Sequence, residues 1–357
     1  MMHAGAGRAT ATPTLAFHSK WITKKPPKPR KPNTKNLIIL SSNHSSPSTL
    51  TNNHVSSSCN FPKGNSSNNN SKERVFFLDV NPLCYKGSTP SLHSFIHWIS
   101  LFFSQVSLSH PVIAVIDGEG GHQHRQQILP SYKAHRIKFF RRVSTSRELL
   151  NSPVGRSHQL IIEFLNDCNV PVLKIAGQEA DDVVATLAKQ ILDRRKKVVI
   201  ASPDKDFKQL ISEDVQLVQP VPELDRWSFY TLKHYIAQYN CDPQSDLSLR
   251  CMFGDVVDGI PGIQNLVPGF GRKTALKLIR KHGSLENLLN EASVRTVGRE
   301  YAQEALTKYA FELRRNYQVL ALRRDVDVHI QEEWLSERDA TNDSTAIEKL
   351  RKLVRGC

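Results

Sequence analysis

Short apolar runs alternate with amphipathic stretches through the middle of this chain. The runs have the length of buried strands and lie at residues 74–80, 111–117, 171–175 and 197–202. Between them, apolar residues recur at helical spacing over residues 91–103, 157–170 and 179–197. This order predicts an α/β fold with a mostly parallel sheet and flanking helices, followed by a helical region from Asp246 onward.

Acidic residues gather where the predicted strands end, which is the edge of a parallel sheet where ligands bind. Asp79 and Asp117 close two of the runs, and Glu179 is expected to reach the same edge from the loop before its helix. Asp255 and Asp258 are expected to share one face at the end of another helix. We therefore predict a cleft lined by nine acids: Asp79, Asp117, Glu179, Asp181, Asp182, Asp204, Asp206, Asp255 and Asp258.

Carboxylates packed this closely repel one another unless cations lie between them. Ligation by oxygen alone, without His or Cys, suits Mg²⁺ or Mn²⁺ rather than zinc. Two such ions about 4 Å apart can activate a water and stabilise the leaving oxygen in phosphodiester hydrolysis. A single Asp at a strand end is usually a cap or a solvated charge, so the hypothesis rests on the repetition at several strand ends.

A glycine-rich hairpin follows the last two acids. GDVVDGIPGI at residues 254–263 is followed by PGFGRKTALKLI, which predicts a helix–hairpin–helix. Backbone amides and the helix N-terminus in such a hairpin hold the phosphates of a duplex without reading its bases. The residues expected to bind DNA there are Gly269, Gly271, Arg272 and Lys273.

The first 72 residues carry ten Lys and Arg and no acid, and they are rich in Ser, Asn, Thr and Pro. Such a composition cannot bury enough apolar surface to fold alone, so we expect a disordered leader. We interpret it as a chloroplast or mitochondrial transit peptide. The alternative is a basic arm that contacts nucleic acid. The leader supplies most of the net charge of +14, so the rest of the chain is only mildly basic.

Two classes of protein are not expected. No apolar run approaches the roughly 20 residues that cross a bilayer, which argues against a membrane-spanning protein. The six cysteines are scattered without a CxxC pair, which supports neither a disulfide framework nor a zinc site.

Several segments, in their order along the chain, resemble those of the 5′ nucleases: FLDVNPLCYKG, VIDGEGG, SYKAHR, GQEADDVVATLA, SPDKDFKQLI, GDVVDGIPGI and PGFGRKTALKLI. This family includes the 5′→3′ exonuclease domain of bacterial DNA polymerase I, phage 5′ exonucleases and flap endonucleases. With its leader, the chain is similar to the stand-alone organellar 5′→3′ exonucleases of plants. The resemblance implies a PIN-like sheet domain, a helical arch, two divalent ions, and K⁺ at the helix–hairpin–helix.

The resemblance also implies roles for single residues. The first metal site is expected to comprise Asp79, Asp117, Glu179 and Asp181, and the second Asp204, Asp206 and Asp258; Asp182 and Asp255 would support them through water. At the base of the arch, Lys133 and Arg136 would contact the scissile phosphate. A basic strip suited to threading a single strand continues through Lys138, Arg141 and Arg142.

The chain departs from the family pattern in three places. Gly259 stands where Asn is usual, Pro203 precedes Asp204, and residues 264–267 lengthen the hairpin. The first two leave every expected metal ligand intact. The insertion affects only the placement of the loop that would grip the duplex.

Together these observations predict a Mg²⁺-dependent 5′→3′ exonuclease or 5′-flap endonuclease of organellar DNA replication and repair. It is expected to act as a monomer on DNA with a free 5′ end or flap, and on RNA–DNA hybrids. Two alternatives stay open, a 5′ nuclease acting mainly on RNA and a non-catalytic nucleic-acid-binding scaffold. The expected parts are a leader (1–72), a catalytic domain (73–240, with the arch at about 130–157), a helix–hairpin–helix subdomain (241–325) and a C-terminal extension (326–357).

Overall fold

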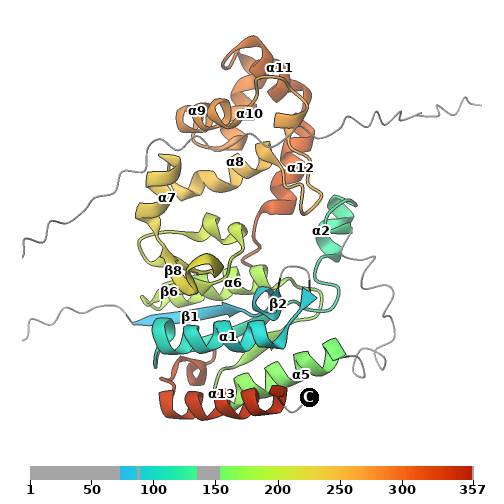
Figure 1. Ribbon diagram of the computed structural model, residues 1–357. Coiled ribbons are helices and arrows are strands. Elements are labelled where there is room, and N and C mark those ends of the chain that lie inside the picture. The colour runs from blue at the N-terminus through green and yellow to red at the C-terminus, as the bar shows by residue number, and fades with distance from the viewer. Residues whose placement is uncertain (1–72, 87–88, 135–152, 356–357) are drawn as a thin grey trace, which may run out of the picture. The chain divides into compact units, whose positions relative to one another are not determined.

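The computed structural model describes residues 73–86, 89–134 and 153–355. The predicted leader, most of the predicted arch, and Arg136, Lys138, Arg141 and Arg142 lie outside these residues. Figure 1 shows the described elements in the order of the chain.

A six-stranded sheet forms the first half of the described chain, in the order β5-β4-β1-β6-β7-β8. Its first five strands are parallel and only β8 runs antiparallel, against β7. The predicted mostly parallel sheet is therefore confirmed, although the sequence patterns did not indicate the β7–β8 hairpin. The strands are β1 (Arg74–Asp79), β4 (Val112–Ile116), β5 (Val172–Lys174), β6 (Lys197–Ala201), β7 (Val215–Val221) and β8 (Arg226–Tyr230), and a separate pair comprises β2 (Tyr85–Lys86) and β3 (Thr89–Pro90).

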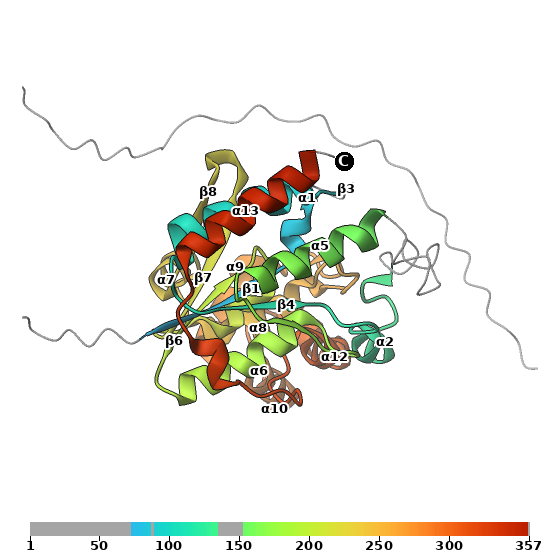
Figure 2. The ribbon, with the colours of Figure 1, turned by 90° about the horizontal axis from the view of Figure 1, so that it is seen from below.

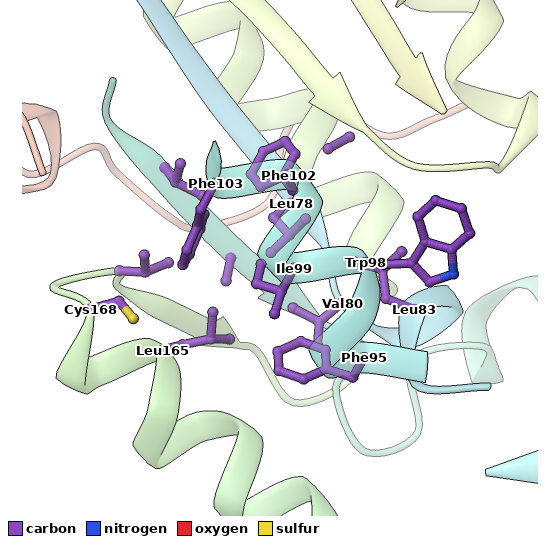
Figure 3. Close-up of a cluster of buried hydrophobic side chains, with 14 of the residues drawn as sticks. Leu78, Val80, Leu83, Phe95, Trp98, Ile99, Phe102, Phe103, Leu165 and Cys168 are labelled. Atoms are coloured by element: carbon purple, nitrogen blue, oxygen red, sulfur yellow. The ribbon is translucent and has the colours of Figure 1, made fainter. Parts of the chain in front are cut away.

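Side chains alternate along β1, so the strand contributes to a core on each face of the sheet. Phe76 and Leu78 point into a cluster covered by α1 (Leu92–Phe102), α5 (Pro153–Asp167) and α13 (Ala340–Arg355). Figure 3 shows the part of this cluster where Leu78 meets Phe95, Ile99 and Phe102 of α1.

The opposite face of the sheet carries Val75 and Phe77, which share a second core cluster with residues of α6 (Ala180–Asp193) and with Tyr235 of α7 (Leu232–Tyr239). Helices thus cover both faces, as the alternation of strand and helix predicts. Glu179 is the N-cap of α6 and has extended backbone angles, so it reaches the sheet edge from the loop as expected.

A helical subdomain with its own core follows the sheet. Its helices are α8 (Asp246–Phe253), α9 (Arg272–His282), α10 (Leu285–Val294), α11 (Glu300–Lys308) and α12 (Ala310–Leu320). Leu129 and Tyr132, from the turn after α2 (Gln123–Ile128), are buried in the same core. The turn after α2 therefore lies between the sheet and the helical subdomain.

One sequence expectation about this subdomain is wrong. Asp255 and Asp258 do not lie at the end of a helix, because α8 ends at Phe253 and Gly254 caps it with a φ of +69°. The two acids lie in the turn that follows, which is closed by hydrogen bonds between Asp255 and Ile260.

The chain returns to the sheet after α12. Val326 and Ile330 are buried beside α6, and α13 then packs against α1 and α5 on the other face. Figures 1 and 2 both show α13 beside α1 and α5. The fully buried Arg338 anchors this helix through Asp343 at 2.5 Å and the hydroxyl of Ser107 at 2.8 Å.

Short helical turns connect the longer elements. They are η1 (Asn81–Cys84), η2 (Phe103–Ser107), η3 (Lys205–Leu210), η4 (Pro222–Leu224), η5 (Pro243–Ser245), η6 (Ile263–Asn265) and η7 (Glu332–Leu335). No helix in the described ranges is both long enough and apolar enough to span a bilayer.

Candidate active site

Asp79 and Asp117 lie at the carboxyl ends of the neighbouring strands β1 and β4. The Ser202 hydroxyl donates to Oδ2 of Asp79 at 2.8 Å, and the side-chain amide of Asn81 donates to Oδ2 of Asp117 at 2.6 Å. Burial, together with the charges of Asp117 and Asp204, raises the pKa of Asp79 to about 8. The Asp79 carboxyl is thus short of positive charge, which a bound cation would supply.

Glu179 binds three side chains of the segment 125–133. Arg125 and Lys133 each form an ion pair with its carboxylate, and the Tyr132 hydroxyl donates to Oε2 at 3.0 Å. Burial alone would raise the pKa of Glu179, but Lys133 and Arg125 outweigh it and the net shift is downward. Glu179 is consequently ionised and firmly held at the N-terminus of α6.

Asp181 and Asp182 occupy the first turn of α6. Asp182 accepts two hydrogen bonds from the Arg125 guanidinium, at 2.7 and 2.9 Å, and one from the backbone amide of Arg323 at 2.8 Å. Asp181 lies 3.7 Å from Arg125, and burial raises its pKa. Both Asp182 oxygens therefore have protein donors, whereas Asp181 accepts at Oδ1 from the backbone amide of Asp182 at 2.8 Å and keeps Oδ2 for another cation.

The second group of acids begins directly after β6. Asp204 caps η3 by accepting from the backbone amide of Asp206 at 2.9 Å. Asp206 lies 2.5 Å from the guanidinium of Arg250, a buried residue of α8. Burial together with the Asp204 charge raises the pKa of Asp206 to about 7, in spite of Arg250.

Asp255 and Asp258 complete this group from the turn after α8. Lys205 lies 2.7 Å from Asp255, and the Lys205 side chain is 52% exposed. The carbonyl of Asp258 accepts from the backbone amide of Lys133 at 2.9 Å. Burial alone would raise the pKa of Asp255, but the ion pair with Lys205 outweighs burial and the net shift is downward.

All nine predicted acids thus lie around one edge of the sheet, and protein cations compensate several of them. In the part of the chain that the structure describes, no three His, Cys, Asp or Glu side chains already converge in the manner of a metal site. The donors are nonetheless all oxygens, and burial raises the pKa values of Asp79 and Asp206, so a bound cation would favour their ionised forms. This donor set fits hard divalent ions.

The glycine-rich hairpin has the predicted form. Gly269 has a φ of +86°, and Gly271 is the N-cap of α9, so the helix begins at Arg272 as expected. Lys273 is exposed in the first turn. The Arg272 guanidinium lies over the ring of Tyr239 at 4.7 Å, so its charge lies beside α7.

Comparison with known proteins identifies the family. A family model described as 5′-3′ exonuclease, N-terminal resolvase-like domain, matches residues 73–240. A second, described as 5′-3′ exonuclease, C-terminal SAM fold, matches residues 241–343. The chain belongs to the 5′-3′ exonuclease family. It is thus a hydrolase of the nuclease class, as the sequence motifs predict.

Two curated relatives each match most of this chain. A 5′-3′ exonuclease of Aquifex aeolicus is 29% identical over 261 residues, which are 72% of this chain and 81% of that protein. DNA polymerase I of Bacillus caldotenax is 26% identical over 272 residues, but the match spans only 29% of the polymerase.

Solved structures support the fold. The T5 D15 protein co-crystallised with metal ions has a TM-score of 0.56 and 22% identity, over 80% of this chain and 99% of that one. The T5 D15 flap endonuclease in a pseudo-enzyme-product complex with DNA and metal ions has a TM-score of 0.53 and 20% identity, over 77% and 100%. At this identity the likeness confirms the α/β sheet and helical architecture.

Sequence reasoning missed several residues of this 5′-3′ exonuclease site. Arg125, Tyr132, Ser202, Lys205 and Arg250 all contact the acids. Arg250 carries a signal that could have found it, because it is a charged residue within the otherwise apolar run LRCMF just before the GDVVD acids. Arg125, in HQHRQQ, carries no such signal.

Proposed function

We propose that this chain is a divalent-metal-dependent 5′ nuclease acting on DNA with a free 5′ end or a 5′ flap. The observation that carries the proposal is the gathering of oxygen donors at one sheet edge, from the ends of β1 and β4, the loop before α6, the start of η3 and the turn after α8. Hard ions such as Mg²⁺, with Mn²⁺ as a substitute, suit these oxygen donors.

The acids divide into two groups that fit two ions. The first comprises Asp79, Asp117, Glu179 and Asp181, and the second Asp204, Asp206 and Asp258. When bound, two such ions supply a water of lowered pKa and Lewis-acid stabilisation of the phosphate. Asp182 and Asp255 contact Arg125 and Lys205 and support the groups from outside.

Lys133 is suited to the scissile phosphate. Its side chain is 16% exposed and its ammonium pairs with Glu179, so Lys133 lies at the border between the first group and solvent. A phosphate oxygen arriving there can take over one of the three N–H donors of Lys133 while Glu179 keeps another. Arg136 would add a second cation from the segment that leads into the predicted arch.

The hairpin before α9 is suited to the duplex. The positive φ of Gly269 turns the backbone, and the exposed amides at the start of α9 with Lys273 can hold a phosphate. K⁺ at this hairpin and threading of the 5′ strand past Lys138, Arg141 and Arg142 extend the proposal. The complex of T5 D15 flap endonuclease with DNA and metal ions supports the choice of substrate.

The biological setting follows from the leader. An acid-free, Ser-rich N-terminal segment is typical of import into chloroplasts or mitochondria. We therefore place the nuclease in organellar DNA replication and repair, where it would remove primers and flaps as a monomer.

A paired assay tests the activity. Cleavage of a 5′-flap DNA and of the matching RNA–DNA hybrid is measured with Mg²⁺ and with EDTA. We expect flap cleavage with Mg²⁺ that leaves a 5′-phosphate and stops in EDTA. Cleavage that persists in EDTA would refute metal dependence. Cleavage confined to RNA strands would favour an RNA nuclease, and inert protein on every substrate would favour a scaffold.

A further inference from the structure

A buried arginine lies behind the acids of the first group. Arg125 comes from α2 and is 4% exposed, so a DNA strand cannot reach its guanidinium. On the other side, Arg250 of α8 pairs with Asp206 in the second group. Each group of acids therefore has one internal cation that belongs to the protein.

Every nitrogen of the Arg125 guanidinium has acceptors. Nε donates to the carbonyl of Val319 at 2.8 Å, one terminal nitrogen binds Glu179 and Asp182, and the other binds Asp182 at 2.7 Å and the carbonyl of Ala321 at 3.5 Å. These acceptors belong to α6 and its N-cap and to the end of α12. The planar fork of arginine can serve all of them at once, whereas a lysine ammonium has only three donors on one atom.

We propose that Arg125 is a positioning residue, which fixes Glu179 and Asp181 for divalent-metal binding and ties their position to the end of α12. The inference deepens the proposed function and rests on it. Asp182 holds Arg125 in place and is the bracket of this arrangement. Arg125 and the backbone amide of Arg323 donate hydrogen bonds to both of its carboxylate oxygens. The metal site of the sheet would thus depend on the docking of the helical subdomain.

The two cations that contact Glu179 have different roles. Arg125 lies on its protected side and Lys133 on the side nearer solvent, with side-chain exposures of 4% and 16%. A metal can take the place of Lys133 beside Glu179, or a phosphate can share the Lys133 ammonium, without disturbing the buried pair of Glu179 and Arg125. Arg125 then keeps the carboxylate in place while its second partner is exchanged.

Binding of Mn²⁺ to the full chain, followed by electron paramagnetic resonance without substrate, tests the inference. Arg125→Lys keeps the charge but loses the fork, so we expect Mn²⁺ affinity to fall by about 10- to 100-fold, as for other groups that orient metal ligands. Arg338→Lys is the matched control, since Arg338 is equally buried and also pairs with an aspartate, Asp343, but lies behind α13. It should lower the melting temperature and leave Mn²⁺ affinity within twofold of wild type.

If Arg125→Lys binds Mn²⁺ with wild-type affinity and stoichiometry, the inference is wrong, while the proposal of a metal-dependent nuclease still holds. An equal loss in Arg338→Lys would also overturn it, because general destabilisation would then explain both. If Arg125→Lys does not fold, Asp182→Asn replaces it, and unchanged Mn²⁺ affinity there refutes the bracket. A wild-type protein that binds no Mn²⁺ would refute the proposed function itself.

Discussion

The backbone amide of Lys133 donates a 2.9 Å hydrogen bond to the carbonyl of Asp258, while its side chain pairs with Glu179. One residue thereby joins the two groups of acids. Its φ of +48° is unusual for a residue other than glycine, and such backbone strain persists only where surrounding contacts enforce it. The turn after α2 is consequently held to the turn that carries Asp255 and Asp258.

Gly259 permits this contact. It has a φ of +73°, and a Cβ at this position would lie 2.2 Å from the carbonyl oxygen of Ser131. We expect Gly259→Ala to lower the free energy of unfolding by about 2–4 kcal/mol, since steric overlap adds to backbone strain. Chemical denaturation measures this change in the free energy of unfolding. Gly177→Ala is the control, because Gly177 has a φ of +74° with nothing within 4 Å of the added Cβ. Equal losses would refute the role of the Ser131 contact.

Asp206→Asn tests the second group of acids. Asn keeps the size of the side chain but removes a charge and a hard ligand, so single-turnover flap cleavage at saturating Mg²⁺ should fall by roughly 10²-fold or more. Flap affinity in Ca²⁺ should stay the same or tighten slightly, because less negative charge faces the phosphates. Asp193→Asn, at the exposed far end of α6, should cleave normally. Wild-type cleavage by Asp206→Asn would contradict the two-ion proposal.

Lys273→Ala tests the grip on the duplex. Removing one phosphate contact should weaken binding of all sequences alike and reduce the slope of log K against log salt by about 0.9. Binding is measured in Ca²⁺ over a range of salt concentrations. Lys233→Ala, an exposed lysine of α7, serves as the comparison and should leave the slope unchanged. An unaltered slope in Lys273→Ala would place the duplex elsewhere.

The pKa of Asp79 predicts a pH dependence of the metal-free protein. The folded protein keeps Asp79 protonated up to about pH 8, whereas the unfolded chain releases this proton near the ordinary 3.8. Between these values the folded state binds more protons, so this contribution to stability is present below about pH 4 and lost as pH rises through 8. Asp79→Asn should therefore gain at least about 1.4 kcal/mol relative to wild type between pH 5 and 9 in EDTA. A constant difference between the two proteins would refute the raised pKa.

Deletion of residues 1–72 tests the leader. The described fold starts at Glu73, so the truncated protein should keep nearly all its flap cleavage in vitro but fail to enter the organelle. Import and flap affinity are measured side by side. Loss of most DNA affinity, or import without the leader, would instead favour the basic-arm interpretation.

The sequence predicted those parts of the site that depend on local pattern. Asp79 and Asp117 follow apolar runs, and parallel strands bring their carboxyl ends to one edge. The turn that carries Asp255 and Asp258 was mistaken for a helix end, because apolar spacing does not reveal that Gly254 takes a positive φ.

Long-range partners lay beyond such reasoning. Arg125 contacts Glu179 and Asp182 across 54 and 57 residues, and it donates to the carbonyl of Val319, which is 194 residues away. No local period encodes these pairings. The β7–β8 hairpin was not predicted for another reason, because both strands are only partly buried and β8 mixes Arg226 and Ser228 with aromatic residues.

The anchoring of α13 by Arg338 bears on how the protein is made. Residues from the last part of the chain, among them Ile347 and Leu350, complete the core beside α1. During synthesis the strands of the sheet emerge before α13, so one face of the sheet stays partly uncovered until residues 340–355 have left the ribosome. Nascent chains that stall upstream of residue 340 would therefore present an apolar surface to chaperones.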